Sequence, residues 1–319
     1  MRIVKGVTAL VLAATFAAAC SSGGASPSID PGTGATPEPT AASLAPSDAA
    51  SPSAEACATD SLPLKTAGTL TVGADNPAYP PYFAHREGGN TPPWEDSEFT
   101  GDPTTGEGFE SAVAYAIAEE LGIAKENVNW IVVPFNNSFA PGAKEFDFYL
   151  TQVSYKPERA EAADLSEGYY TVSQSVVALE GSPLAGAKTI AELADYTFGA
   201  QVGTTSYDTI VNTIKPTKDP QVFDSNDLAI EALSSGQIDG LVVDLPTADF
   251  VTNVQAENAV TVGKFDTGDT EYFSVVLEKD SELTPCVNAA IATLNEDGTF
   301  EGLVTKWLPF QAAVPAFQP

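Results

Sequence analysis

The sequence contains one histidine and three cysteines among its 319 residues. The histidine, His85, lies in a stretch rich in proline and glycine, so neither a histidine-based triad nor a histidine-rich zinc site can be assembled. Residues 199–205 follow an expected strand but match neither the GxGxxG fingerprint nor a phosphate-binding loop. The sequence does not exclude a hydrolase that uses two carboxylates. No cofactor and no metal ion are expected.

Positive charge is also scarce, because 14 Lys and Arg residues stand against 43 Asp and Glu residues. Removal of residues 1–19 takes away two cations and no acid, which leaves a net charge of −31. Such a field repels nucleic acids and anionic lipid headgroups. We therefore expect no nucleic-acid partner, and contact with a membrane only through a lipid anchor.

The N-terminus is typical of an exported protein. Two cations precede an apolar run of about 12 residues, whereas a membrane-spanning helix needs roughly 20. Residues 1–19 therefore read as a signal peptide. Cys20, followed by Ser-Ser-Gly-Gly, resembles the lipoprotein box of bacteria, whose cysteine carries acyl chains such as palmitate; Ala17 stands where leucine is usual. An ordinary signal-peptidase site at Ala17-x-Ala19 is the alternative.

The other two cysteines form an even pair once Cys20 is lipidated. We expect Cys57 and Cys286 to form a disulfide in an oxidising compartment; two buried free thiols are the alternative. Residues 21–56 are almost entirely Ala, Ser, Pro, Thr and Gly, which cannot bury enough surface to offset the entropy of ordering. A disordered tether, open to glycosylation, is therefore assigned to residues 20–66 together with the lipidated cysteine.

The remaining part, about 260 residues, suits two lobes and alternates between strands and helices. Such alternation predicts an α/β fold with mostly parallel sheets flanked by helices, and a ligand beyond the carboxyl ends of the strands. Strands are expected at 69–72, 130–133, 146–153, 175–179, 198–202, 240–243 and 273–277, and helices at 109–121, 228–234, 283–294 and 300–308. The uniformly apolar strand at 175–179 is expected inside its sheet.

A series of short motifs follows along the chain. In order they are GTLTVGAD (68–75), YPPYF (79–83), GFE (108–110), AEELG (118–122), FD (146–147), Ser154, KPERA (156–160), DLSEGY (164–169), QVGTT (201–205), GQIDG (236–240), VD (243–244), NEDGT (295–299) and KW (306–307). Their order resembles that of family 3 extracellular solute-binding proteins, the amino-acid receptors of ABC importers. The resemblance covers residues 67–310.

The resemblance implies the two-lobed periplasmic-binding fold of type II. Residues 67–171 and 268–319 would form one lobe and residues 172–267 the other, joined by two hinge strands. The implied protein is a monomeric, lipid-anchored receptor on the extracellular face of a bacterial cell membrane. It would capture an amino acid or a related small polar solute and deliver it to the permease and ATPase subunits of an ABC transporter.

The resemblance also assigns ligand-binding roles. Arg159 of the KPER motif would grip the α-carboxylate, for which its planar guanidinium is suited, and Ser154 would touch the same group. Asp244 would hold the α-ammonium, and Tyr79 and Phe135 would flank the ligand. Lys156 is expected at the surface. A surface ion pair for Arg159, a structural acceptor for Asp244 and core packing for the two aromatics are the alternatives.

Further candidates come from residues near these motifs. Thr204 and Thr205 open an expected helix, where hydroxyl and N–H groups suit an anion or merely cap the helix. Asp75 and Gln152 complete the predicted ligand-binding set, and Asn136 and Asn137 are either polar contacts or turn residues.

Two alternative functions stay open. Some relatives of the implied family are dehydratases of the prephenate type, and an enzyme of that kind needs an acid in the cleft. A sensory or surface-interaction lipoprotein without transport would have the same sequence features. The stretch from residue 83 to residue 108 is longer than in most members of the family, and nothing in its sequence assigns a role to it.

Overall fold

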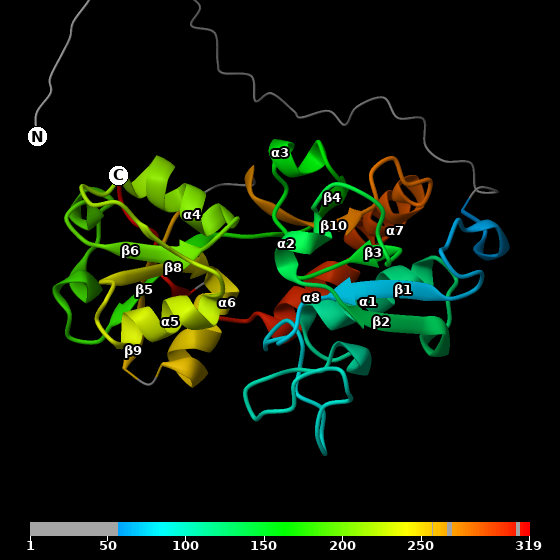
Figure 1. Cartoon of the computed structure of the whole chain (residues 1–319), viewed down its shortest axis with the longest axis horizontal. Coiled ribbons are helices and arrows are strands. Elements are labelled where there is room, and N and C mark those ends of the chain that lie inside the picture. Colours follow the sequence, from blue (N-terminus) through cyan, green and yellow to red (C-terminus); the bar gives the residue numbers. More distant parts are fainter. Residues whose placement is uncertain (1–56, 257, 267–269, 311–312) are drawn as a thin grey trace, which may run out of the picture. The chain divides into compact units, whose positions relative to one another are not determined.

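The structure is a computed structural model that describes residues 57–256, 258–266, 270–310 and 313–319 (Figure 1). Cys20, the expected signal peptide and most of the expected tether therefore lie outside the described residues. Within the described part, no helix has the length and apolarity needed to cross a membrane.

The first sheet has five strands in the order β2-β1-β3-β10-β4. Its strands are β1 Leu70–Ala74, β2 Val128–Val132, β3 Phe148–Tyr149, β4 Asp164–Thr171 and β10 Tyr272–Leu277. Strand β10 runs antiparallel to its neighbours β3 and β4, and the other four strands share one direction. The helices that accompany it are α1 Phe109–Glu120, α2 Phe135–Ser138, α3 Pro157–Ala160, α7 Thr284–Glu296 and α8 Thr299–Trp307.

The second sheet repeats this plan in the order β7-β6-β8-β5-β9. Its strands are β5 Gln174–Leu179, β6 Phe198–Gln201, β7 Gln221–Phe223, β8 Gly240–Asp244 and β9 Ala259–Lys264. Here β5 runs against the other four. The accompanying helices are α4 Thr205–Thr209, α5 Asn226–Ser234 and α6 Leu245–Phe250. The expected two-lobed α/β fold with mostly parallel sheets is confirmed.

Side-chain alternation explains why the second sheet is covered on both faces. Val176 of β5 packs in one apolar cluster with Ile210, whereas its neighbour Val177 packs in another with Leu233 of α5. Successive residues of a strand point to opposite faces, so a uniformly apolar strand needs a layer on each side. Strand β5 lies between β8 and β9, inside the sheet as its sequence predicted.

The strand expected over residues 146–153 is much shorter than predicted. Only Phe148 and Tyr149 pair with neighbouring strands, although the whole stretch is buried or half-buried. The backbone turns away at Gln152, whose φ of 46° lies in the left-handed region and cannot continue a strand. The apolar residues reflect burial here, and not an extended ladder.

The prediction of a disordered tether over residues 20–66 included residues 57–66, which are folded. Residues 57–66 pack on the first sheet's lobe: Leu62 belongs to its core, and the Thr59 hydroxyl donates to the Leu121 carbonyl. The predicted disulfide is confirmed, since Cys57 is bonded to Cys286 of α7. This bond and the buried leucine hold the segment where composition alone suggested a free chain.

The C-terminal residues also depart from the prediction, which grouped residues 268–319 with the first lobe. After α8 the chain reaches the second sheet, where Gln318 and Ala316 form bridges with Thr189 and Lys264. Phe317 is buried there, with its ring centroid 5.1 Å from that of Phe265. Burial of this aromatic ring draws the last residues to the second sheet and adds a connection to the two expected hinge strands.

Candidate functional site

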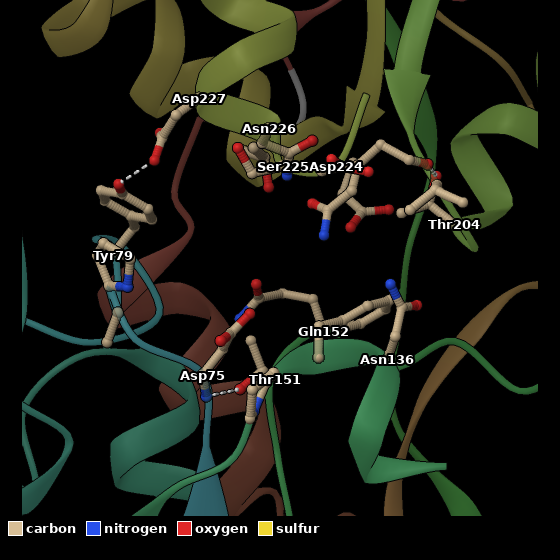
Figure 2. Close-up of a pocket in the computed structure, with 18 of the residues that line it drawn as sticks. Asp75, Tyr79, Asn136, Thr151, Gln152, Thr204, Asp224, Ser225, Asn226 and Asp227 are labelled. Atoms are coloured by element: carbon tan, nitrogen blue, oxygen red, sulfur yellow. Dashed lines mark hydrogen bonds between the residues drawn. The ribbon is translucent and has the colours of Figure 1, made fainter. Parts of the chain in front are cut away.

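A cavity of about 490 Å³ lies where strands of both sheets end (Figure 2). Strands β1, β6, β7 and β8 each deliver polar side chains to it at or just after their carboxyl ends, where ligands bind in open α/β sheets. Eight of the nine predicted ligand-binding residues line it: Asp75, Tyr79, Phe135, Gln152, Arg159, Thr204, Thr205 and Asp244. Both asparagines, Asn136 and Asn137, line it as well.

Arg159 lies at one end of this cavity on the short helix α3. Its side chain is 6% exposed and stacks over the ring of Phe139, with the guanidinium carbon 4.4 Å from the ring centroid. Two N–H groups donate to the carbonyls of Ser154 at 2.5 Å and Gly203 at 2.7 Å. Burial lowers the pKa of Arg159 to about 10, so the side chain stays cationic at neutral pH.

The guanidinium retains capacity for a ligand. It has five N–H donors, and two of them make the bonds to backbone carbonyls. Among the described residues no carboxylate lies within ion-pair distance of Arg159. A buried cation without a partner carboxylate is costly, and an anionic group in the cavity would relieve that cost.

Gly203 brings the second lobe close to this arginine. Its φ is +80°, a left-handed conformation that side chains rarely adopt, and a Cβ placed there would lie 2.6 Å from Oδ1 of Asn136. Glycine is thus required both by the backbone and by the close approach of α2. The carbonyl that accepts from Arg159 depends on this turn.

The two threonines after this glycine have different roles. The Thr204 hydroxyl donates to the carbonyl of Gln201 and accepts from the amide of Tyr207, so it caps α4. The Thr205 hydroxyl faces the hydroxyl of Ser154 at 3.4 Å across the two lobes. The Thr205 hydroxyl also accepts from Nε2 of Gln174 at 3.3 Å, so it joins the polar group between the lobes, while that of Thr204 caps the helix.

Asp244 ends strand β8 beside a group of polar side chains. Nε2 of Gln174 donates to Asp244 Oδ1 at 2.5 Å and to Glu271 Oε1 at 3.0 Å. Ser154, the predicted residue that is not in the cavity wall, donates to the same oxygen of Glu271 at 3.0 Å. Burial, assisted by the charge of Glu271, raises the pKa of Asp244 well above its ordinary value. A cation bound here would restore the ionised form.

Tyr79 and Asp75 lie toward the other end of the cavity (Figure 2). The Tyr79 hydroxyl donates to Asp227 at 2.8 Å, and its ring lies 5.9 Å from that of Phe250, so it joins the two lobes. Asp75 follows β1 and accepts from the amide of Asn76 at 2.8 Å. Burial raises the pKa of Asp75, and the charge of Asp227 adds to the effect.

Gln152 lines the cavity, and its N–H groups are bonded to a buried carboxylate. Its backbone N–H donates to Oε1 of Glu110 at 2.7 Å, and its side chain donates to the other oxygen of the same carboxylate. Tyr169 also donates to Glu110, at 2.5 Å. Burial raises the pKa of Glu110 to about 7 despite these bonds. The carboxyl supports the strained backbone beside the cavity.

Several site residues were missed by the sequence analysis. Asp224 and Asp227 line the cavity, and Gln174 and Glu271 form the hydrogen bonds beside Asp244. All four are separated from the recognised motifs, and only the position of Asp224 after a short strand hints at a cleft. Lys156, expected at the surface, has a side chain that is 24% exposed and pairs with Asp208 of α4 at 2.5 Å across the lobes.

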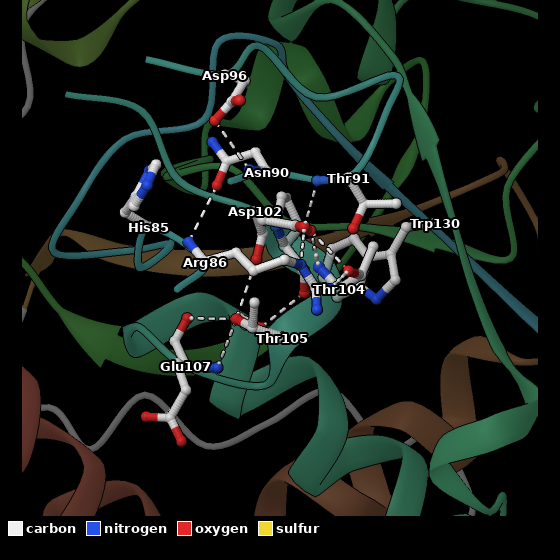
Figure 3. Close-up of polar contacts among 12 residues, drawn as sticks. His85, Arg86, Asn90, Thr91, Asp96, Asp102, Thr104, Thr105, Glu107 and Trp130 are labelled. Atoms are coloured by element: carbon white, nitrogen blue, oxygen red, sulfur yellow. Dashed lines mark hydrogen bonds and ion pairs between the residues drawn. The ribbon is translucent and has the colours of Figure 1, made fainter. Parts of the chain in front are cut away.

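The long stretch over residues 83–108 forms its own polar network on the first lobe (Figure 3). Fully buried Asp102 accepts from Arg86 Nε at 2.6 Å, from the Thr91 amide at 2.8 Å and from the Thr104 hydroxyl at 2.6 Å. Burial acts to raise the pKa of Asp102, but the bonds from Thr104 and Arg86 outweigh it and hold the pKa below its usual range. Trp94 fills the core beneath. These hydrogen bonds and the buried tryptophan hold residues 83–108 in one conformation on the first lobe.

No group of three or more potential metal-ligating side chains gathers within the described part of the chain. Opposed charges and hydrogen-bonding groups from two lobes fit a small polar solute. Comparison with known proteins agrees. The sequence model of the bacterial extracellular solute-binding proteins, family 3, matches residues 70–310. The chain belongs to this family.

Individual relatives are amino-acid-binding proteins. The L-cystine-binding protein TcyJ of Escherichia coli is 28% identical over 249 residues, which cover 76% of this chain and 84% of TcyJ. The arginine-binding extracellular protein ArtP of Bacillus subtilis is 25% identical over 205 residues, 63% of this chain and 77% of ArtP.

Solved structures share the fold. An ancestral arginine-binding protein bound to arginine has a TM-score of 0.60 and 25% identity, and the match covers 76% of this chain and 98% of that protein. An ancestral amino-acid-binding protein, AncCDT-1, described as a precursor of cyclohexadienyl dehydratase, has a TM-score of 0.57 and 25% identity, covering 75% and 95% of the two chains.

Proposed function

We propose that this protein is a lipid-anchored receptor that binds an amino acid outside the cell and delivers it to an ABC transporter. The observation that carries the proposal is the presence of Arg159 and Asp244 in one cavity. A zwitterionic ligand presents one anionic and one cationic group, and these two side chains are the matching pair. The Thr205 hydroxyl lines the same cavity, and it would reach the ligand's carboxylate by exchanging its 3.4 Å bond to Ser154 for one to the ligand.

Binding is proposed to close the two lobes, with residues 57–171 and 270–310 in one and residues 172–266 and 313–319 in the other. Arg159 follows the first sheet's strand β3, whereas Asp244 ends β8 of the second sheet. A ligand held by both is a bridge between lobes. The chain passes between the sheets after Thr171 and after Lys264, and these connections would act as hinges.

A screen of the 20 amino acids by thermal shift tests the proposal, followed by calorimetry on those that stabilise the protein. A ligand at 100 times its Kd raises the free energy of unfolding by roughly 2.7 kcal/mol, a shift that such a screen detects. At least one α-amino acid is expected to bind, and its N-acetyl and amide derivatives, which lack one of the two charges, are expected not to. Absence of binding by every amino acid would overturn the proposal.

A second candidate function, a dehydratase, is supported by one observation. Asp244 lines the cavity with a raised pKa, and a neutral carboxyl in a cleft is able to donate a proton to a leaving hydroxyl. A turnover assay with prephenate as substrate separates the two functions. Protonation of the hydroxyl releases water while the ring carboxylate leaves as CO2, which gives phenylpyruvate. Release of phenylpyruvate that is lost in Asp244→Asn would establish the enzyme, whereas the receptor is expected to give none.

A further inference from the structure

The charge of the cavity is unbalanced. Arg159 is the one cationic side chain among its lining residues, and four aspartates accompany it. A ligand's α-carboxylate and α-ammonium groups would use Arg159 and Asp244. Three carboxylates, those of Asp75, Asp224 and Asp227, then remain to face the rest of the ligand.

Arg159 and the pair Asp75 and Asp227 lie toward different sides of the cavity, its first and second regions, since Arg159 bonds to Gly203 beside Thr204. Among the charges that act on Arg159 are those of Asp208, Asp244, Glu271 and Glu158. Asp75, by contrast, is acted on by Asp227. Figure 2 shows Asp75 and Asp227 toward the side of the cavity that Tyr79 borders, away from Thr204. The second region lies where a side chain would extend from an amino acid held at the first.

The second region has carboxylates from both lobes and no cation. Asp75 follows β1 of the first sheet, and Asp227 lies in the first turn of α5 beside the second sheet. No Lys or Arg of the described residues forms an ion pair with Asp75, Asp224 or Asp227. Asp227 accepts from the Tyr79 hydroxyl at 2.8 Å, which orients it toward the other lobe.

We propose that the ligand is an amino acid with a positively charged side chain, which lies between Asp75 and Asp227. The inference rests on the proposed function, because it places the α-groups at Arg159 and Asp244. Two like charges that face each other repel, and a cation between them turns this repulsion into attraction. A neutral side chain leaves the repulsion in place, and an acidic one adds to it.

In this arrangement the side chain of the ligand contributes to lobe closure as well as to specificity. Asp75 and Asp227 belong to different lobes, so a guanidinium or ammonium group between them ties the lobes together at a second point. Tyr79 already joins them at this place through its hydroxyl. A ligand without the distal charge is expected to bind more weakly because it engages only the first region.

Calorimetry with L-arginine and L-citrulline tests the proposal, since citrulline replaces the guanidinium with a neutral group of similar shape. Arginine or lysine is expected to bind at least tenfold more tightly than citrulline, glutamine, glutamate and cystine. In Asp75→Asn and Asp227→Asn the affinity for the cationic ligand should fall at least tenfold, while that for citrulline should change less than threefold. Asp219→Asn is the matched control, because it removes one exposed acid of the second lobe outside the cavity wall and should leave every affinity unchanged.

The outcomes separate this inference from the proposed function. Equal or tighter binding of citrulline, glutamine, glutamate or cystine, with binding still lost in Arg159→Ala, would overturn the cationic ligand and leave the amino-acid receptor standing. Preference for arginine that persists in both aspartate variants would also overturn it, because the charge would then be recognised elsewhere. No binding by any of these amino acids would overturn both proposals.

Discussion

Replacement of Arg159 by alanine is the most direct perturbation of the proposed site. The side chain is 6% exposed and lies against the rings of Phe139 and Phe135, with its guanidinium carbon 4.4 Å and 5.5 Å from their centroids. Its charge is therefore screened little by solvent. A carboxylate that pairs with it is also removed from water, so loss of the arginine leaves that carboxylate buried without a partner.

The magnitude follows from this burial. Truncation of one partner of a buried charge pair costs about 2–5 kcal/mol, and about 1.4 kcal/mol corresponds to a tenfold change in affinity. Arg159→Ala is therefore expected to weaken binding by about thirty-fold to several thousand-fold. Arg159→Lys keeps the charge but loses the planar fork that also reaches the carbonyls of Ser154 and Gly203, so an intermediate loss is expected.

Lys156→Ala is the control for this experiment. Lys156 lies three residues earlier and also bridges the lobes, through its ion pair with Asp208. That pair is partly exposed, with side-chain exposures of 24% and 37%, and such pairs contribute about 0–1 kcal/mol. Its loss should change affinity no more than about fivefold.

Calorimetry with the identified ligand measures all three variants, and urea denaturation establishes that each is folded. Loss of affinity in Arg159→Ala with a normal unfolding transition supports a direct contact with the ligand. A folded Arg159→Ala that binds within threefold of the wild type would refute the reasoning, because the ligand's carboxylate would then lie elsewhere.

Four further predictions follow from particular residues. Burial raises the pKa of Asp244, and a bound ammonium would lower it, so binding should release protons and weaken as the pH falls below the pKa of the free protein; calorimetry in buffers of different ionisation enthalpy should detect the release, and none is expected in Asp244→Asn. Reduction of the Cys57–Cys286 bond should lower the free energy of unfolding by about 2–5 kcal/mol in denaturation curves, and equal stability with and without reductant would contradict this. Gly203→Ala should lower the free energy of unfolding by about 1–2 kcal/mol in denaturation curves, and unchanged stability would show that the backbone adapts to the added Cβ. Cys20→Ser should release the protein into the medium or leave it unprocessed in cell fractionation, since lasting attachment needs the acyl chains; a normally cleaved, membrane-bound variant would exclude the lipid anchor.

The sequence by itself predicted the elements whose periodicity is strong. The helix expected over 109–121 is α1 at Phe109–Glu120, and the apolar strand expected at 175–179 is β5. A helix or strand of this kind depends on residues that are close together in the sequence and on which of its faces are buried. The local pattern of apolar residues indicates both. The order of motifs indicated the family and hence the two-lobed fold, and it also indicated which residues to look for in a cleft.

Features that depend on contacts between distant segments were determined only by the tertiary structure. It shortened the expected strand over 146–153 to Phe148 and Tyr149, because the backbone turns at Gln152 onto the buried carboxylate of Glu110. It also drew the last residues to the second sheet, where the ring of Phe317 is buried. Neither outcome has a local signal, since each depends on a partner far along the chain.

The same reason explains the cavity's second charged region. Asp75 and Asp227 are separated by some 150 residues, and among 43 acidic residues nothing in the sequence singles out this pair. The motif order located the residues expected at the α-groups, because the family uses them repeatedly. Which carboxylates face the ligand's side chain depends on how two loops from two sheets meet, and that meeting exists only in the folded protein.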